Sequence, residues 1–170
     1  GIVLHAISTL LIYLLLASLF HPRSVTLMAS LLFAVHPIHV ERVTNITGSF
    51  DLLGIVLILS ALYLYIKSAQ KEKKRFFYFS LILFILALLA SEEAFVVPLL
   101  IVLYEWAFHK KKGEGFKRKK PIGLFFLLAL AFWLVRVMVL GVGARANEYH
   151  GGSLWVTLMT MVKVVAGYIW

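Results

Sequence analysis

The sequence predicts an all-α membrane protein, a polytopic bundle of transmembrane helices. Of its 170 residues, 62% are hydrophobic and only 15% are charged, and the mean hydropathy is +0.94. A soluble domain of this size has roughly 25% charged residues. The apolar residues also fall into long runs separated by short polar stretches, which is typical of helices that cross about 30 Å of hydrocarbon. Lipid must therefore act as part of the solvent of this chain.

Seven apolar segments are predicted as membrane helices. They cover residues 2–20, 24–40, 50–66, 76–91, 93–108, 121–140 and 154–170. A spanning helix needs about 20 residues, and the first, third, sixth and seventh segments come close to that length. The fourth and fifth segments separate two basic clusters, so we expect them to form an out-and-back pair.

The positive charge predicts the sidedness of the loops. Twelve of the seventeen Lys and Arg residues lie in two stretches, which are Lys67, Lys71, Lys73, Lys74 and Arg75, and Lys110, Lys111, Lys112, Lys117, Arg118, Lys119 and Lys120. Basic residues beside apolar runs mark cytoplasmic loops. We therefore expect residues 21–23, 67–75 and 109–120 on the cytoplasmic side, and residues 36–51 and 141–153 outside. Anionic lipid is a compatible contact, whereas nucleic acid is not an expected partner.

The first outer loop holds most of the candidate site. Its ionisable residues are His36, His39, Glu41, Arg42 and Asp51. The apolar run before it, residues 25–35, would rise only about 16 Å as a helix. These side chains are therefore expected below the outer surface, where polar groups need a cavity or one another. Pro37 disfavours helix at the preceding residue, so a kink is expected there.

Three interpretations of this loop stay open. It forms a wall of a substrate cavity, or a salt-bridged loop at the headgroups, or a metal site made of His36, His39 and Glu41. No third fixed ligand is evident for the metal site, and Pro37 breaks the helical spacing of such ligand pairs. We expect no metal.

A second outer feature is the turn Ser91-Glu92-Glu93, which lies between two short segments. Adjacent carboxylates repel, so one is expected to be protonated or paired with Arg42 or Arg145. Alternatively, either acid caps the following helix through its dipole. We expect this turn to meet the outer end of segment 24–40. One cavity would then be lined by His36, His39, Glu41 and Glu93, with Arg136 or Arg145 near it.

Two polar residues, His5 and Arg136, lie within apolar runs. A polar residue inside a membrane helix is a functional candidate by default. Arg136 lies near the outer end of its segment, so it can instead extend its side chain to the interface.

These motifs also resemble a known family. The resemblance is carried by five segments: LHA (4–6), HPIHVERVTNITGSFDLL (36–53), ASEEAFVVPLL (90–100), RVMVLGVGAR (136–145) and VVAGYIW (164–170). It resembles the membrane half of the O-mannosyltransferases that join a GT-C transmembrane domain to C-terminal TPR repeats, including bacterial and archaeal relatives. The family usually has Gly-Arg at Gly48-Ser49 and Ser-Lys-Glu at Ser91-Glu92-Glu93. Both departures remove a positive charge from the outer face and bear on how the donor phosphate is held.

The resemblance implies that residues 1–170 form a partial GT-C-like transmembrane domain of an integral multi-pass protein, in a prokaryotic plasma membrane or the ER membrane. The N-terminal helix, the first outer loop and the TPR repeats would lie outside it. The implied reaction transfers a sugar, expected to be mannose, from a polyprenyl-phosphate carrier to a polypeptide hydroxyl on the non-cytoplasmic face, with no cofactor and no divalent metal. An acidic residue upstream of Gly1 would be the catalytic base.

The candidate residues take their roles from that reaction. Cations such as Arg42, Arg136 or Arg145 would pair with the lipid phosphate. The residues His36, His39 and Glu41 would orient the sugar hydroxyls or the base. Two other classes stay open. In a transporter or proton-coupled channel, the outer His and Glu residues would form a relay, although they gather at one face instead of crossing the bilayer. A non-catalytic membrane scaffold is the third.

Overall fold

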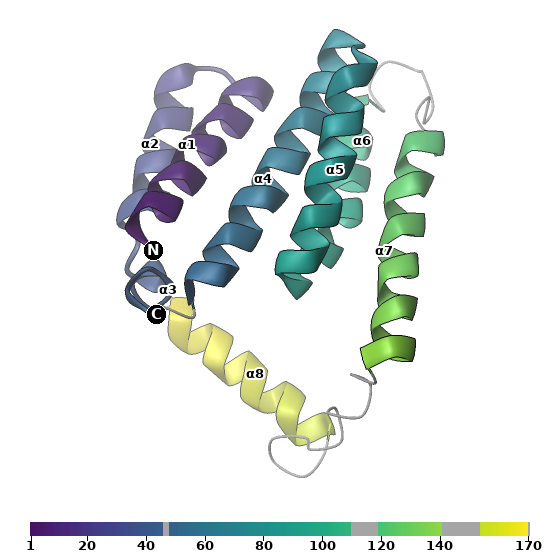
Figure 1. Cartoon of the computed structure of the whole chain (residues 1–170). Coiled ribbons are helices and arrows are strands. Elements are labelled where there is room, and N and C mark those ends of the chain that lie inside the picture. Colours follow the sequence, from purple (N-terminus) through teal and green to yellow (C-terminus); the bar gives the residue numbers. More distant parts are fainter. Residues whose placement is uncertain (46–47, 110–118, 141–153, 170) are drawn as a thin grey trace. The chain divides into compact units, whose positions relative to one another are not determined.

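The computed structural model describes residues 1–45, 48–109, 119–140 and 154–169, and these residues form helices without any strand. In chain order the elements are α1 (Ile2–Leu19), α2 (Arg23–Val35), the 3-10 turn η1 (Pro37–His39), α3 (Val40–Thr44), α4 (Gly48–Lys71), α5 (Lys74–Ala90), the 3-10 turn η2 (Glu92–Val96), α6 (Val97–His109), α7 (Lys119–Leu140) and α8 (Leu154–Ile169) (Figure 1). The predicted all-α class is confirmed for this part of the chain. The chain divides into two compact units, Gly1–Leu130 and Ala131–Trp170.

Three described helices are long and apolar enough to cross a membrane: Ile2–Leu19, Gly48–Lys71 and Pro121–Val139, with hydropathies of 2.3, 2.1 and 2.5. The bent pair Arg23–Val35 and Pro37–Thr44 is a fourth if it forms one span. The protein is therefore an integral, multi-pass membrane protein. All seven predicted segments contain a helix, but α5, α6 and α8 have 17, 13 and 16 residues. Seven spans therefore stays a prediction.

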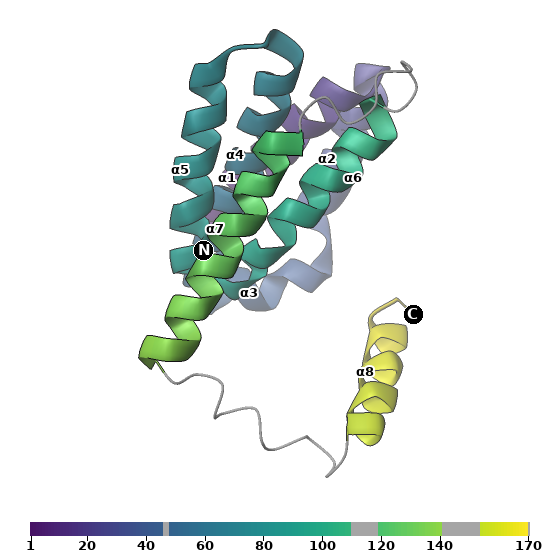
Figure 2. The same cartoon turned by 90° about the vertical axis from the view of Figure 1, so that its right-hand side faces the viewer.

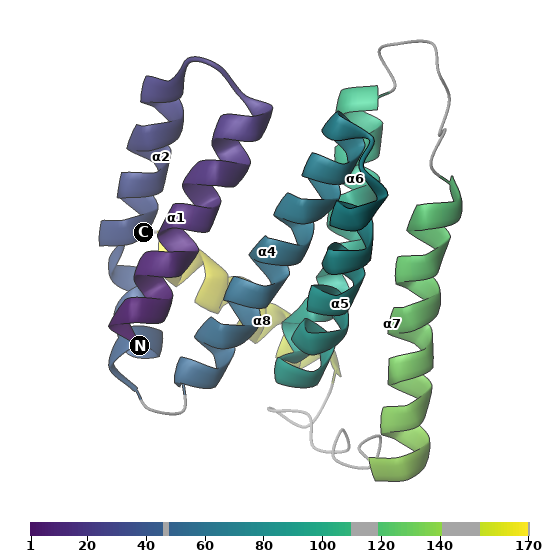
Figure 3. The ribbon, with the colours of Figure 1, turned by 45° about the horizontal axis from the view of Figure 1, so that its top comes forward.

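The helices of the first unit alternate in direction. The turn after α1 and the turn after α4 lie at one end, whereas α3 and η2 lie at the other (Figures 1 and 3). The helices α5 and α6, joined by η2, run in opposite directions, as expected of an out-and-back pair (Figure 2). The basic turn between α4 and α5 therefore lies at the same end of the first unit as residues 21–23, as the charge pattern predicts. Which end faces the cytoplasm stays a prediction.

Three predicted boundaries are wrong. Segment 24–40 stops being α-helix at Val35, because His36 is extended (φ −66, ψ 126) before Pro37. This is the expected kink, and the two helical pieces meet at 47°. Segment 50–66 continues to Lys71, because Lys and Gln are good helix formers whose stems lie along apolar surface. Segment 93–108 begins as the 3-10 turn η2 and becomes α-helix only at Val97.

The core of the first unit surrounds α4, against which α1, α3, α5 and α6 pack. Three fully buried rings meet there: Phe125 of α7 lies 5.7 Å from Tyr65 and 5.1 Å from Phe84, between ring centroids. The Tyr65 hydroxyl donates a 2.9 Å hydrogen bond to the buried carboxylate of Glu105. This buried carboxylate is thus paired with a hydroxyl inside the bundle, which lowers the cost of placing it away from water.

The second unit contains the end of α7 and helix α8. Arg136 lies there and is half-buried. Large apolar side chains of α8 are exposed, among them Trp155, Met159 and Val162, which suits contact with lipid.

Candidate functional site

The polar end of the first unit is built around the break at Pro37. The backbone N–H of Ile38 donates to His36 Nδ1 at 3.2 Å, so the His36 side chain caps the 3-10 turn. Proline fits the first position of such a turn, since it has no N–H to satisfy. The turn leads directly into α3, from which Arg42 reaches Glu93 in the η2 turn. The kink predicted from the sequence thus determines where the cation lies.

An ion pair joins this end of α3 to the α5–α6 turn. Arg42 Nη2 lies 2.9 Å from Glu93 Oε1, and the side chains are 42% and 44% exposed. The hydrogen bond to Glu93 raises the pKa of Arg42, and the charges of Asp51 and Glu41 act in the same direction. Exposed pairs stabilise a fold by only about 0–1 kcal/mol. The pair therefore matters chiefly because it orients the guanidinium.

Two glycines of α4 allow the close approach of both partners. A Cβ on Gly48 would lie 2.6 Å from the Arg42 carbonyl oxygen, and a Cβ on Gly54 would lie 2.5 Å from Ser91 Cβ. The Ser91 hydroxyl in turn accepts the backbone N–H of Glu93 at 3.2 Å. Any side chain at these glycines would push α3 or η2 away from α4. Sequence reasoning noted Gly48 only as part of the family motif and missed Gly54.

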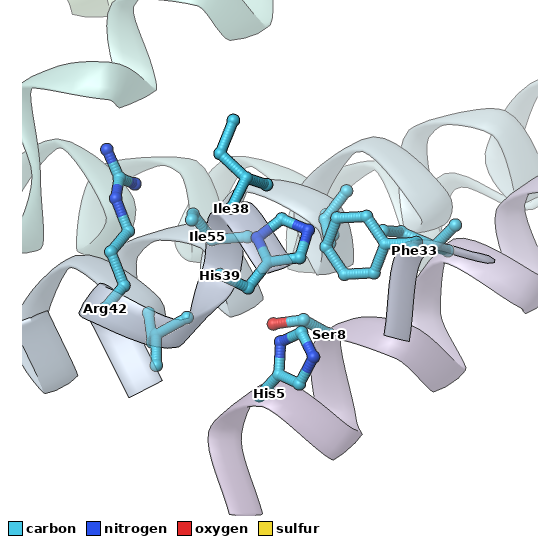
Figure 4. Close-up of a pocket in the computed structure, with 10 residues that line it drawn as sticks. His5, Ser8, Phe33, Ile38, His39, Arg42 and Ile55 are labelled. Atoms are coloured by element: carbon cyan, nitrogen blue, oxygen red, sulfur yellow. The ribbon is translucent and has the colours of Figure 1, made fainter. Parts of the chain in front are cut away.

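A pocket of about 330 Å³ lies between α1, the α2–α3 connection and α4 (Figure 4). It is lined by His5, Ser8, Ile12, Phe33, Ile38, His39, Arg42, Leu52, Ile55 and Leu59. Polar groups occupy the outer part, where α1 begins and η1 crosses. Further along these helices, Ile12 of α1 and Ile55 and Leu59 of α4 are apolar. The pocket thus has a polar mouth and an apolar interior.

Aromatic rings form one wall of the mouth. The His39 ring centroid lies 4.2 Å from that of Phe33 and 5.2 Å from that of His5. Figure 4 shows these three rings gathered at the pocket. Burial lowers the pKa of His39, and the neighbouring His5, His36 and Arg42 act in the same direction. The neutral imidazole is therefore the favoured form of His39.

His5 has an asymmetric environment. Its Nε2 lies 3.0 Å from the Ala34 carbonyl oxygen, which can only accept, so Nε2 carries the proton. The other nitrogen, Nδ1, is buried and has no hydrogen-bond partner in the described part of the chain. The sequence marked His5 as a polar residue in an apolar run but did not place it in the site. Its spacing from Ser8, one helical turn later, was the available signal.

The predicted cavity of these outer residues stays a prediction, because this pocket has a different lining. Of His36, His39, Glu41 and Glu93, only His39 lines this pocket. His36 accepts the hydrogen bond that caps the 3-10 turn, and Glu41 is exposed on α3. Glu93 contacts Arg42, which lines the pocket. The predicted meeting of the loop with the Ser91 turn is confirmed by that ion pair.

The remaining candidates lie outside the pocket lining. Asp51 and Glu92 are exposed. Arg136 belongs to the second unit, and Arg145 lies outside the described residues. Within the described ranges, no three His, Cys, Asp or Glu residues gather as ligands for a metal ion.

Comparison with known proteins gives a consistent result. Residues 1–140 match the family model described as dolichyl-phosphate-mannose-protein mannosyltransferase. The whole chain is 32% identical to the protein O-mannosyl-transferase F38B6.6 of Caenorhabditis elegans, of which it covers 24%. A stretch of 66 residues, 39% of the chain, is 44% identical to mouse protein O-mannosyl-transferase TMTC3 and covers 7% of it. No solved structure matches. The chain thus spans about a quarter or less of the length of these relatives.

Proposed function

The chain belongs to the dolichyl-phosphate-mannose-protein mannosyltransferase family, and from this premise we propose that it forms part of the membrane module of a protein O-mannosyltransferase that takes mannose from a polyprenyl-phosphate carrier. The acceptor is a polypeptide hydroxyl on the non-cytoplasmic face. The family description and the names of the relatives support mannose and a protein acceptor. The carrier and the face are further parts of the proposal.

One observation carries the proposal: a cation, Arg42, is among the residues that line an apolar-walled pocket, at the end of the bundle that holds the polar turns. A lipid-linked donor needs a cation here because its phosphate is anionic, and an apolar-walled pocket beside the cation can keep water from the reacting sugar. The bond to Glu93 uses one terminal nitrogen of Arg42. A guanidinium has five N–H donors, so others can bind phosphate oxygens. In this role Glu93 would hold the guanidinium in place for the phosphate.

The proposed reaction is a substitution at the anomeric carbon of mannose. The acceptor oxygen forms the new C–O bond as the bond from that carbon to the phosphate oxygen breaks. The hydroxyl proton passes to a general base, for which the resemblance implies an acidic residue upstream of Gly1. The leaving group is polyprenyl phosphate, whose added negative charge Arg42 would stabilise.

A charge swap in the full-length protein tests the role of Arg42. The single variants Arg42→Glu and Glu93→Arg, and the double variant, are assayed for mannose transfer from a radiolabelled polyprenyl-phosphate mannose to a peptide acceptor. Thermal stability is measured alongside. We expect the double variant to recover the stability of the wild type, because the pair is restored. Its turnover should stay about 100-fold low, since the cation no longer stands beside the pocket.

The thermal stability of the same variants serves as the control, because it separates an effect on folding from an effect on catalysis. Turnover that recovers together with stability would show that the pair is only structural. No transfer by the wild-type protein, with solute or ion flux in liposomes instead, would favour the transporter.

A further inference from the structure

The buried Nδ1 of His5 identifies the kind of group that the pocket receives. With the Nε2 proton directed at Ala34, Nδ1 is the ring nitrogen left to accept, and it has no partner among the described residues. A buried acceptor without a hydrogen bond is unfavourable. A ligand that supplies a donor at this point would remove that cost.

Ser8 extends the same acceptor surface. Its hydroxyl donates to the Leu4 carbonyl oxygen at 2.9 Å, so its hydroxyl oxygen offers lone pairs and no further proton. Both His5 and Ser8 line the pocket. An ionised phosphate offers only acceptors and would meet acceptors here. A bare isoprenoid chain offers no donor at all. Hydroxyl groups, in contrast, match this wall.

The aromatic side chains of the pocket suit a sugar ring. Phe33 and His39 present aromatic faces whose centroids are 4.2 Å apart, and a pyranose has an apolar C–H face that can lie against such rings. Small-ligand pockets span roughly 300–1,000 Å³, so 330 Å³ has room for one sugar unit and not for a complete lipid-linked donor. The apolar interior beyond, which includes Ile12 and Leu59, would keep bulk water from the sugar.

We propose that this pocket seats the mannosyl ring of the donor, with His5 Nδ1 and Ser8 Oγ accepting hydrogen bonds from its hydroxyls. The inference rests on the proposed function. In this arrangement Arg42 at the mouth takes the phosphate, and the aromatic rings and acceptors behind it recognise the sugar. His5 and Ser8 thus determine which glycosyl lipid is bound.

Two isosteric replacements of His5 separate the ring nitrogens. The amide oxygen of Asn can stand near the position of Nδ1, whereas the amide nitrogen of Gln can stand near that of Nε2. The full-length protein in nanodiscs is titrated with polyprenyl-phosphate mannose and with bare polyprenyl phosphate. We expect His5→Gln to weaken binding of the mannosyl lipid roughly tenfold, which corresponds to one hydrogen bond. The bare lipid should bind as before. We expect His5→Asn to retain the preference for the mannosyl lipid.

Ser8→Ala is the second test variant, and Ser30→Ala is its matched control. Ser30 is also buried and makes the same kind of bond to the carbonyl four residues earlier, but it does not line the pocket. Ser8→Ala should weaken binding of the mannosyl lipid alone, and Ser30→Ala should change neither affinity.

These binding measurements test the sugar subsite independently of whether the protein transfers mannose. Equal losses for both lipids would mean that His5 only supports the fold, and unchanged binding in both His5→Gln and Ser8→Ala would mean that water satisfies Nδ1. Either result overturns the subsite, even if the wild type transfers mannose. A loss confined to the mannosyl lipid supports it, whether or not transfer is detected.

Discussion

His39 is the residue at which burial and neighbouring charge act together. Its pKa is lowered from the ordinary 6.5, first by burial and then by His5, His36 and Arg42. The folded protein therefore binds fewer protons at this site than the unfolded chain does. The stability that His39 contributes is complete above the unfolded pKa of 6.5. It is lost as the pH falls below that value and through the lower folded pKa.

We therefore expect the melting temperature of the full-length protein to decrease as the pH is lowered from about 8 to about 5. The decrease should be smaller in His39→Phe. Phenylalanine keeps the ring packed against Phe33 and removes the titration. His21→Asn is the control, because His21 is exposed in the turn at the other end of the bundle. An identical acid-induced fall in His39→Phe and the wild type would rule out this role of His39.

At the residue scale, the sequence predicts which charged groups pair better than it predicts the hydrogen bonds of individual side chains. The sequence predicts that one of the two adjacent acids can pair with Arg42 or Arg145, and in the structure Glu93 pairs with Arg42. The orphaned His5 Nδ1 could not be predicted, since it depends on the Ala34 carbonyl from another helix taking the other nitrogen. Sequence contains no signal for that choice.

The junction of α4 with η2 is the element-scale feature that holds the site together. A Cβ on Gly54 would lie 2.5 Å from Ser91 Cβ, so Gly54→Ala must displace the turn that carries Glu93. We expect the substitution to lower the free energy of unfolding by about 1–3 kcal/mol, although alanine favours helix by about 1 kcal/mol. Reversible unfolding in mixed detergent micelles measures it.

Gly123→Ala in α7 is the matched control, because a Cβ there meets nothing within 4 Å. This variant should be as stable as the wild type or more so. If Gly54→Ala were also stabilising, the close contact would be one that η2 relaxes without cost, and Gly54 would not determine the position of Glu93.

Element boundaries show where sequence reasoning stops. Pro37 predicts the end of α2 because its effect on the chain is local. The continuation of α4 to Lys71 and the pairing of Tyr65 with Glu105 were missed. Glu105 lies near the end of an apolar run and resembles an interfacial acid. Its burial depends on how α4 and α6 pack, which is a tertiary contact that periodicity does not encode.

The alternation of helices in the first unit follows from the distribution of charge along the whole chain. The turn of α4 into α5 carries the basic residues, and the opposite end carries the pocket, the ion pair and η2 (Figure 1). The seven segments and this up-and-down order could be predicted because hydropathy and basic clusters are long-range averages. The contents of the pocket could not, because they depend on single side chains from three elements.

Sidedness is the prediction that belongs to the whole molecule. Lys73 in the α4–α5 turn is expected in the cytoplasm, and Glu41 on the opposite side. Both side chains are exposed, and this chain contains no cysteine. Cysteines placed singly at these positions in the full-length protein, after replacement of any cysteines elsewhere, therefore report the topology. In intact cells or sealed vesicles of cytoplasm-inside orientation, an impermeant thiol reagent should label Glu41→Cys directly and Lys73→Cys only after permeabilisation. Labelling of Lys73→Cys before permeabilisation would invert the topology and place the pocket in the cytoplasmic leaflet, where it could not meet a donor presented on the opposite face.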